Sequence, residues 1–190
     1  HKEYRRQRQM CIRDRSLCYQ LSGKILKKTV LIISPLLSLM NDQVEQLKYI
    51  GEKKVTALTS ELSYSERNFI LHNLASYSFI YLSPEMLKND KVAAQLVTID
   101  IGRLVVDEAH CISQWGPDFR PDYLQIKHFR KLLHNPLTLA LTATATNKVA
   151  QDIQTSLFDS SETPRTIRYS VDRPNTVSYT HLTLPTILLV

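Results

Sequence analysis

Glycine is scarce in this sequence: four occur in 190 residues, and the first is Gly23. The pattern G-x-x-x-x-G-K-[ST], whose glycines let backbone N–H groups close around phosphates, is therefore absent. No run of 18 apolar residues occurs, so we expect no membrane span. The basic N-terminus lacks a following apolar stretch, which argues against a signal peptide.

Cysteine is also sparse, and its three positions are Cys11, Cys18 and Cys111. None belongs to a C-x-x-C pair and the number is odd, so neither a disulfide framework nor a zinc site is expected. No H-E-x-x-H pattern is present, which excludes a metalloprotease of that type. This cysteine usage favours a reducing, cytoplasmic location, which in a bacterium would include the nucleoid.

The composition, 43% hydrophobic and 22% charged, suits one globular domain. A net charge of +6 would favour nucleic-acid binding if it were spread over the domain. However, six basic and two acidic side chains fall within residues 1–15, which leaves only +2 for the remaining 175 residues. The overall charge is therefore weak evidence for a nucleic-acid partner.

The two ends differ in composition from the middle of the chain. Residues 1–15 are arginine-rich, and residues 177–190 contain no Lys, Arg, Asp or Glu. Met10–Arg15 and Val177–Thr186 resemble translated sequencing adapters. We therefore predict non-native segments at 1–15 and 177–190 around a domain at 16–176. A native basic arm and a native last strand are the alternative.

Short apolar, β-branched runs alternate with helical patterns through the middle of the chain. This alternation predicts an α/β domain in which helices cover both faces of a parallel sheet, in three layers. Gly51 follows one helical pattern as a C′ residue, and Ser63 with Glu66 forms a capping box for another. The expected strands are 29–34, 54–58, 78–82, 103–106, 138–141 and 166–169, and the expected helices are 36–47, 63–74, 123–133 and 147–157.

Polar residues follow four of the expected strands. In a parallel sheet the carboxyl ends of the strands share one edge, and ligands bind there. We therefore predict a site along that edge. Its members are Ser34-Pro35, Ser83-Pro84-Glu85, Asp107-Glu108 and Thr142-Ala143-Thr144.

The acidic pair suggests phosphoryl-transfer chemistry. Asp107 at a strand end can hold Mg²⁺, because this ion prefers hard oxygen ligands, and Glu108 can orient and deprotonate an attacking water. An ordinary acidic loop is the alternative. The Leu141–Thr146 stretch presents hydroxyls that can bridge a nucleotide site and a DNA track, or else forms a turn in which Thr146 caps a helix.

The stretch after the acidic pair carries the only tryptophan of the chain, Trp115, together with Phe119, Tyr123 and Arg120. Aromatic faces beside a guanidinium are suited to stacking unpaired bases. Aromatic side chains that simply pack beneath the loop are the alternative.

Taken together, these stretches resemble the first RecA-like domain of RecQ-family ATP-dependent DNA helicases, of the P-loop NTPase type. The resemblance runs from about residue 16 to residue 175 in the family's order and spacing. Its aromatic-rich loop is the most specific part, because it separates this family from other helicases with a similar acidic box. The matching stretches are Ser16–Leu21, Ile33–Val44, Tyr81–Glu85, Val105–Tyr123, Leu141–Thr146 and Asp172–Asn175.

The resemblance implies a role for each matching residue. Ser16 and Asp107 would bind Mg²⁺ and, with Thr142, contact ATP, while Glu108 would activate water. His110 has no metal-ligand partner at a suitable spacing, so we expect a hydrogen-bonding relay and not a zinc ligand. The residues implied to contact DNA or to couple it to the nucleotide site are Ser34, Pro35, His110, Gln114, Trp115, Phe119, Arg120 and Thr144.

The resemblance also implies a motor that couples ATP hydrolysis to 3′–5′ translocation on single-stranded DNA and to unwinding of forked DNA in recombination and repair. Arg15 stands where the family has Lys, and no glycine precedes Ser16, so we expect the chain as printed not to hydrolyse ATP appreciably. Two alternatives remain: a nucleic-acid-binding fragment without ATPase activity, and a related helicase that acts on RNA. The oligomeric state is not predicted.

Overall fold

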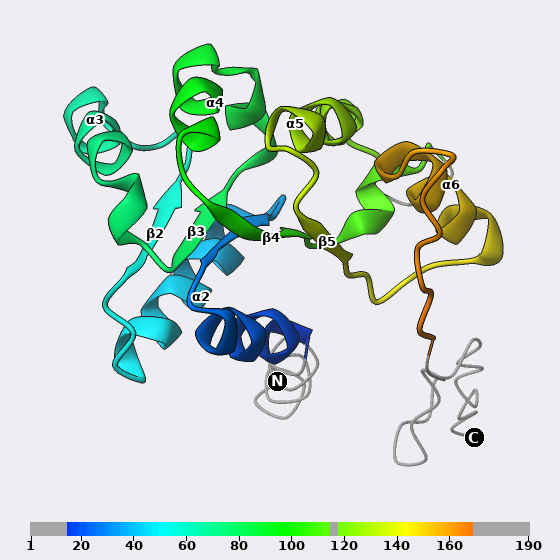
Figure 1. The fold of residues 1–190 in the computed structure, drawn as a ribbon, viewed down its shortest axis with the longest axis horizontal. Helices are drawn as coiled ribbons and strands as arrows, with labels where there is room; N and C mark the ends of the chain where they lie inside the picture. Colours follow the sequence, from blue (N-terminus) through cyan, green and yellow to red (C-terminus); the bar gives the residue numbers. More distant parts are fainter. Residues whose placement is uncertain (1–14, 115–117, 169–190) are drawn as a thin grey trace, which may run out of the picture.

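The structure, a computed structural model, describes residues 15–114 and 118–168. Five parallel strands form one sheet in the order β2-β3-β1-β4-β5 (Figure 1). Each of them lies within two residues of an expected strand. Their bounds are β1 Thr29–Ile33, β2 Val55–Leu58, β3 Phe79–Leu82, β4 Ile101–Val106 and β5 Leu137–Ala140.

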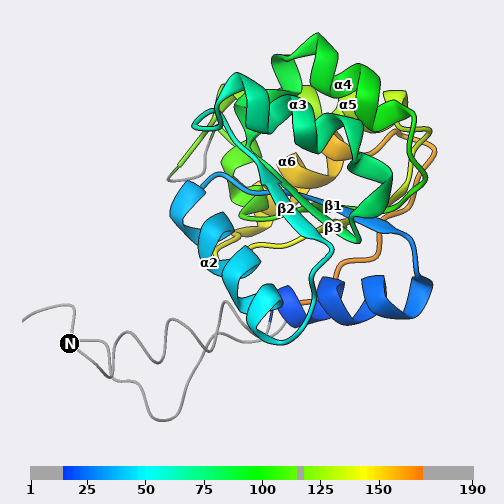
Figure 2. The same cartoon turned by 90° about the vertical axis from the view of Figure 1, so that its left-hand side faces the viewer.

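Helices cover both faces of the sheet, which confirms the predicted three layers (Figures 1 and 2). The helix of residues 15–26 and α2 (Leu37–Tyr49) lie on one face. On the other face lie α3 (Tyr64–His72), α4 (Asp90–Val97), α5 (Ile126–Leu132) and α6 (Asn147–Leu157). No helix within the described ranges is long and apolar enough to cross a bilayer.

The alternation of side chains along each strand produces two hydrophobic cores. In β1, Leu31 and Ile33 point into the core beneath α3 to α6, while Val30 and Ile32 point into the core beneath α2. All four side chains are at most 1% exposed. The sheet is therefore buried on both faces, as a continuous apolar run such as Val30–Ile33 predicts.

Gly23 lets the helix of residues 15–26 approach the sheet closely. A Cβ atom at this position would lie 2.6 Å from Val30 Cγ2 and 2.9 Å from Phe79 Cε1. Such contacts are too short for any side chain larger than hydrogen. Glycine thus fixes the height of this helix above β1 and β3, and with it the position of Ser16 at the start of the helix.

The residues predicted to mark the ends of helices do so in the structure. Ser63 and Glu66 form the capping box of α3, and Thr146 accepts a hydrogen bond from Val149 N–H at the start of α6. Gly51 has φ of 92° just beyond the C-cap of α2, a conformation that glycine adopts without strain.

Three expectations are corrected by the structure. α4 was not expected at all, although its cap, Asn89, accepts from the N–H groups of Lys91 and Val92. The helix expected at 123–133 begins instead with a 3₁₀ turn, η4 (Pro121–Gln125), because Pro121 favours a tight first turn. The helix expected to reach residue 74 ends at His72.

The strand expected at 166–169 does not form over residues 166–168, and Tyr169 lies outside the described residues. Thr166 Oγ1 accepts a 2.7 Å hydrogen bond from Gln154 Nε2, and Arg168 Nη1 donates a 2.6 Å bond to Asn147 Oδ1. Both partners lie on α6. The segment therefore contacts this helix and does not pair with a strand.

Candidate functional site

The predicted edge of the sheet is formed by backbone hydrogen bonds between adjacent strand ends. Asp107 N–H donates to Ile33 C=O at 2.8 Å, and Ser34 N–H donates to Leu82 C=O at 3.1 Å. Ala109 N–H donates to Leu141 C=O at 2.8 Å. Because all strands are parallel, these bonds gather the residues that follow β1, β3, β4 and β5 along one edge.

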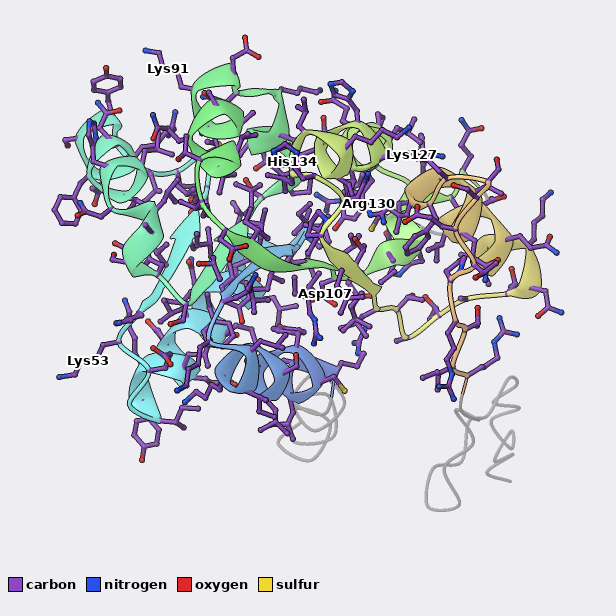
Figure 3. All side chains as sticks on the ribbon, viewed as in Figure 1. Lys53, Lys91, Asp107, Lys127, Arg130 and His134 are labelled. Carbon is purple, nitrogen blue, oxygen red and sulfur yellow. The ribbon has the colours of Figure 1, made fainter. Side chains whose placement is uncertain are left out.

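Asp107 follows β4 directly, at the carboxyl end of that strand (Figure 3). Its Oδ1 accepts a 2.9 Å hydrogen bond from Glu108 N–H, and its backbone C=O accepts a 3.0 Å bond from Tyr123 Oη. Burial and the adjacent Glu108 carboxylate raise the pKa of Asp107 above its ordinary value, while the Arg15 guanidinium acts in the opposite direction. A cation beside the Asp107 carboxylate would therefore be attracted to it.

Glu108 has a left-handed backbone, with φ and ψ both 46°, which is uncommon for a residue with a long side chain. The conformation turns the chain sharply between β4 and the 3₁₀ turn η3 (Ala109–Ile112). Its side chain meets two cationic or basic groups: Oε1 lies 3.1 Å from Arg15 Nη1, and Oε2 lies 3.2 Å from His110 Nδ1.

His110 is buried and connects separate parts of the edge. Besides Glu108, its Nδ1 lies 3.0 Å from Thr142 Oγ1, and its Nε2 lies 3.6 Å from the exposed Asp118 carboxylate. Thr142 Oγ1 in turn lies 3.1 Å from both the carbonyl oxygen and the N–H nitrogen of Thr144. The imidazole thus bridges the segment after β4 and the segment after β5, and no zinc-type cluster of three ligands lies among the described residues.

Ser16 and Asp107 line one small cavity at the start of the helix of residues 15–26. The other lining residues are Arg15, Tyr19, Leu39 and Gln43. A carboxylate and a hydroxyl are hard oxygen donors of the kind that Mg²⁺ prefers. These two residues therefore fit a magnesium ion, which other ligands would have to complete.

The aromatic loop, defined here as residues 114–120, contacts η3 at its last residue. Arg120 N–H donates a 2.9 Å hydrogen bond to Cys111 C=O, so Arg120 lies beside η3, which precedes the loop. Gln114 is exposed, while Phe119 and Arg120 are half-buried. Trp115, the most informative residue of the predicted stacking surface, lies outside the described residues.

Two serine hydroxyls are buried at the same edge without a hydrogen bond. Ser34 and Ser83 are 2% and 1% exposed, and neither Oγ has a hydrogen-bond partner within residues 15–114 and 118–168. Pro35, next to Ser34, is also buried. A buried hydroxyl without a partner costs free energy, so these two positions are candidates for contact with a ligand.

Sequence reasoning did not assign several residues that lie around the cavity and the acidic pair. Tyr19 and Gln43 line the cavity with Asp107, and the Tyr19 and Tyr81 hydroxyls lie 3.5 Å apart beneath it. Arg15 was assigned to a non-native segment, yet it pairs with Glu108.

Solved helicase structures share this fold. The Pyrococcus furiosus Hef helicase domain aligns with a TM-score of 0.52 at 27% identity, over 68% of this chain and 27% of that one. The DNA-bound DUF1998 helicase MrfA aligns with a TM-score of 0.57 at 18% identity, over 73% and 22%, a likeness of fold alone. The parallel sheet with its acidic strand end is thus a RecA-like α/β domain.

Residues 15–153 match the DEAD/DEAH box helicase family, and the chain belongs to that family. It is 52% identical over 163 residues to the probable ATP-dependent DNA helicase RecS of Bacillus subtilis, covering 85% of this chain and 32% of that protein. The ATP-dependent DNA helicase RecQ of the same organism is 42% identical over 142 residues, or 73% and 24%. The predicted resemblance to RecQ-type helicases is confirmed.

A putative ATP-dependent RNA helicase of Acanthamoeba polyphaga mimivirus is 42% identical over 164 residues, covering 85% of this chain and 29% of that protein. The chain spans about a third or less of the length of all three relatives.

Proposed function

We propose that this chain is the first motor domain of an ATP-dependent DNA helicase that moves 3′–5′ on single-stranded DNA and unwinds forked DNA in recombination and repair. The observation that carries the proposal is the contact of His110 with both Glu108 and Thr142. This one side chain joins the acidic strand end to the Thr142–Thr144 segment, and its own turn leads into the aromatic loop. A nucleotide-driven motor needs such a connection between hydrolysis and its track.

The proposed site residues form two groups, one that acts on ATP and one that contacts DNA. Asp107 and Ser16 would hold Mg²⁺ beside the phosphates of ATP, where the metal would supply neutralisation of phosphate charge. Glu108 accepts the proton of the attacking water, and its contact with His110 holds the carboxylate in place. Thr142 and Thr144 form the hydrogen-bonded turn that lies against this pair.

The remaining residues form the DNA side of the site. Ser34 and Pro35 would contact the phosphate backbone, since the buried Ser34 hydroxyl has no hydrogen-bond partner in the described part of the chain. Gln114, Trp115, Phe119 and Arg120 would stack on or sense unpaired bases, which suits aromatic and guanidinium groups.

We further propose that the chain as printed does not turn over ATP by itself. Arg15 stands where a phosphate loop has Lys, and it is already paired with Glu108.

The test is a triple variant, Gln9→Gly/Asp14→Gly/Arg15→Lys, in which residues 9–16 match the pattern G-x-x-x-x-G-K-S. It should gain Mg·ATP binding by calorimetry, and Asp107→Ala in that background should remove it. DNA-stimulated phosphate release by the unaltered chain would contradict the proposal.

The similarity to a putative RNA helicase supports RNA as the alternative track. Binding of matched fluorescent DNA and RNA oligonucleotides, measured by anisotropy, separates the two. The DNA proposal predicts tighter binding of single-stranded DNA, and equal or tighter binding of RNA would favour the alternative.

A further inference from the structure

Gln43 is the only polar residue among the buried positions of α2 (Leu37–Tyr49), and it is 3% exposed. The other buried residues of this helix, Met40, Val44 and Leu47, belong to the core beneath α2. Burying a primary amide among apolar side chains costs free energy unless hydrogen bonds replace its lost contacts with water. A glutamine at this position is therefore explained by the groups that its amide contacts.

The amide oxygen of Gln43 is held by the neighbouring helix. Gln20 Nε2 donates a 3.0 Å hydrogen bond to Gln43 Oε1, which joins the helix of residues 15–26 to α2 on the same face of the sheet (Figure 2). Gln20 also hydrogen-bonds the Tyr81 hydroxyl, which lies 3.5 Å from the Tyr19 hydroxyl. Because both tyrosines are buried, this polar network has little access to water and fixes the orientation of the Gln43 amide.

The Gln43 side chain also lines the small cavity that contains Ser16 and Asp107. An amide oxygen has two lone pairs, and the bond from Gln20 uses one of them. A magnesium ion bound by a single carboxylate and a hydroxyl keeps several of its water ligands, and such ligands donate hydrogen bonds to oxygen acceptors around the site. Gln43 therefore offers an acceptor in the wall of the cavity where Ser16 and Asp107 would bind the ion.

We propose that Gln43 is a positioning residue of the cation site: its amide oxygen, held by Gln20, accepts a hydrogen bond from water bound to the cation. This inference deepens the proposed function, since it rests on the cation at Ser16 and Asp107. α2 begins two residues after Pro35, so the same amide joins the cation site to the segment that we propose to contact DNA.

The experiment compares the full chain with two variants of Gln43. Gln43→Met has nearly the same length and volume but accepts no comparable hydrogen bond, whereas Gln43→Glu keeps the oxygen and adds a negative charge. Gln46→Met and Gln46→Glu, at an exposed position of the same helix, are the matched controls. Asp107→Ala identifies the Mn²⁺ binding that belongs to this site. Mn²⁺ affinity is measured by electron paramagnetic resonance, and stability by urea unfolding.

The two Gln43 variants should change Mn²⁺ affinity in opposite directions. Gln43→Met should lower it about tenfold, while the urea midpoint stays the same or rises because an apolar side chain replaces a buried amide. Gln43→Glu should raise the affinity roughly three- to tenfold, although its buried carboxylate lowers the urea midpoint. Both Gln46 variants should leave the two quantities unchanged. A merely structural role for Gln43 would make affinity fall together with stability.

If Asp107→Ala abolishes Mn²⁺ binding while both Gln43 variants bind as the unaltered chain does, the role of Gln43 is overturned and the proposed cation site stands. Affinity that falls in both Gln43 variants in step with stability would make Gln43 a purely structural residue. If the unaltered chain shows no Mn²⁺ binding that Asp107→Ala removes, the cation site itself fails, and the proposed function fails with it.

Discussion

Arg15 and Glu108 form an ion pair in which Nη1 lies 3.1 Å from Oε1, with the two side chains 23% and 16% exposed. Arg15 also lines the small cavity that contains Ser16 and Asp107. The positive charge of Arg15 therefore balances the negative charges of Asp107 and Glu108 at the position where we propose a metal ion. Because like charges repel strongly in a partly buried site, Arg15 and a divalent cation compete for the same negative charge.

Replacing Arg15 with Ala should strengthen divalent-cation binding. Removing the guanidinium leaves the carboxylates of Asp107 and Glu108 uncompensated, so affinity for Mn²⁺ as a magnesium analogue should rise roughly three- to tenfold. Titration followed by electron paramagnetic resonance measures it. Lys24→Ala, on the exposed side of the same helix, should not alter binding, and weaker Mn²⁺ binding by Arg15→Ala would refute the competition.

The buried hydroxyl of Ser34 should matter for ligand binding and not for folding. Ser34→Ala removes a buried polar group that has no hydrogen-bond partner in the described residues, so the free energy of unfolding should stay the same or rise by up to about 1 kcal/mol. Affinity for single-stranded DNA should fall several-fold. Urea unfolding and anisotropy measure the two effects, with the exposed Ser38→Ala as control. A destabilised Ser34→Ala with unchanged DNA affinity would make Ser34 a structural residue.

Arg130 should be the most important polar side chain for stability (Figure 3). It is 4% exposed and donates hydrogen bonds to Thr138, Leu157 C=O and both oxygens of Glu162, with its guanidinium 5.0 Å from the Phe158 ring centroid. Arg130→Ala would remove these hydrogen bonds and the contact with Phe158, so it should lower the free energy of unfolding by about 2–3 kcal/mol.

The neighbouring Lys131 provides the control for Arg130. Its side chain is 50% exposed and pairs with Asp159, so Lys131→Ala should change stability by only about 0.5 kcal/mol. Urea denaturation of both variants measures the difference. Similar losses for the two would show that burial of Arg130 contributes little.

Ionisation of Glu162 should make the free energy of unfolding depend on pH in the acid range. Hydrogen bonds from Arg130, followed by the Asp159 N–H, lower the pKa of Glu162 to about 2 from an ordinary 4.5. The stability contributed by the ionised carboxylate is therefore complete above pH 4.5 and is lost as the pH falls toward 2. Urea unfolding across this range should show a shallower decline for Glu162→Gln than for the unaltered chain. Glu61→Gln, at an exposed carboxylate, should decline as the unaltered chain does.

Features that depend on neighbours in sequence were predictable. The capping box of Ser63 and Glu66, the cap at Thr146 and the left-handed Gly51 each need only residues within a few positions. The apolar run of β1 and the polar strand ends likewise predicted a parallel sheet with a site at one edge. α4 was missed because only eight residues form it and its cap, Asn89, follows a 3₁₀ turn that obscures the start.

The order of motifs along the chain by itself determined the class of fold and predicted an acidic site at the carboxyl edge of the sheet, because parallel strands must end at one edge. Tertiary structure alone decided which side chains meet there. Arg15 reaches Glu108 across 93 positions, and Ser113 reaches Asp152 across 39, only because the sheet order β2-β3-β1-β4-β5 brings their elements together. Spacing in sequence sets the faces of helices and strands, whereas contacts between distant residues depend on packing of the whole core.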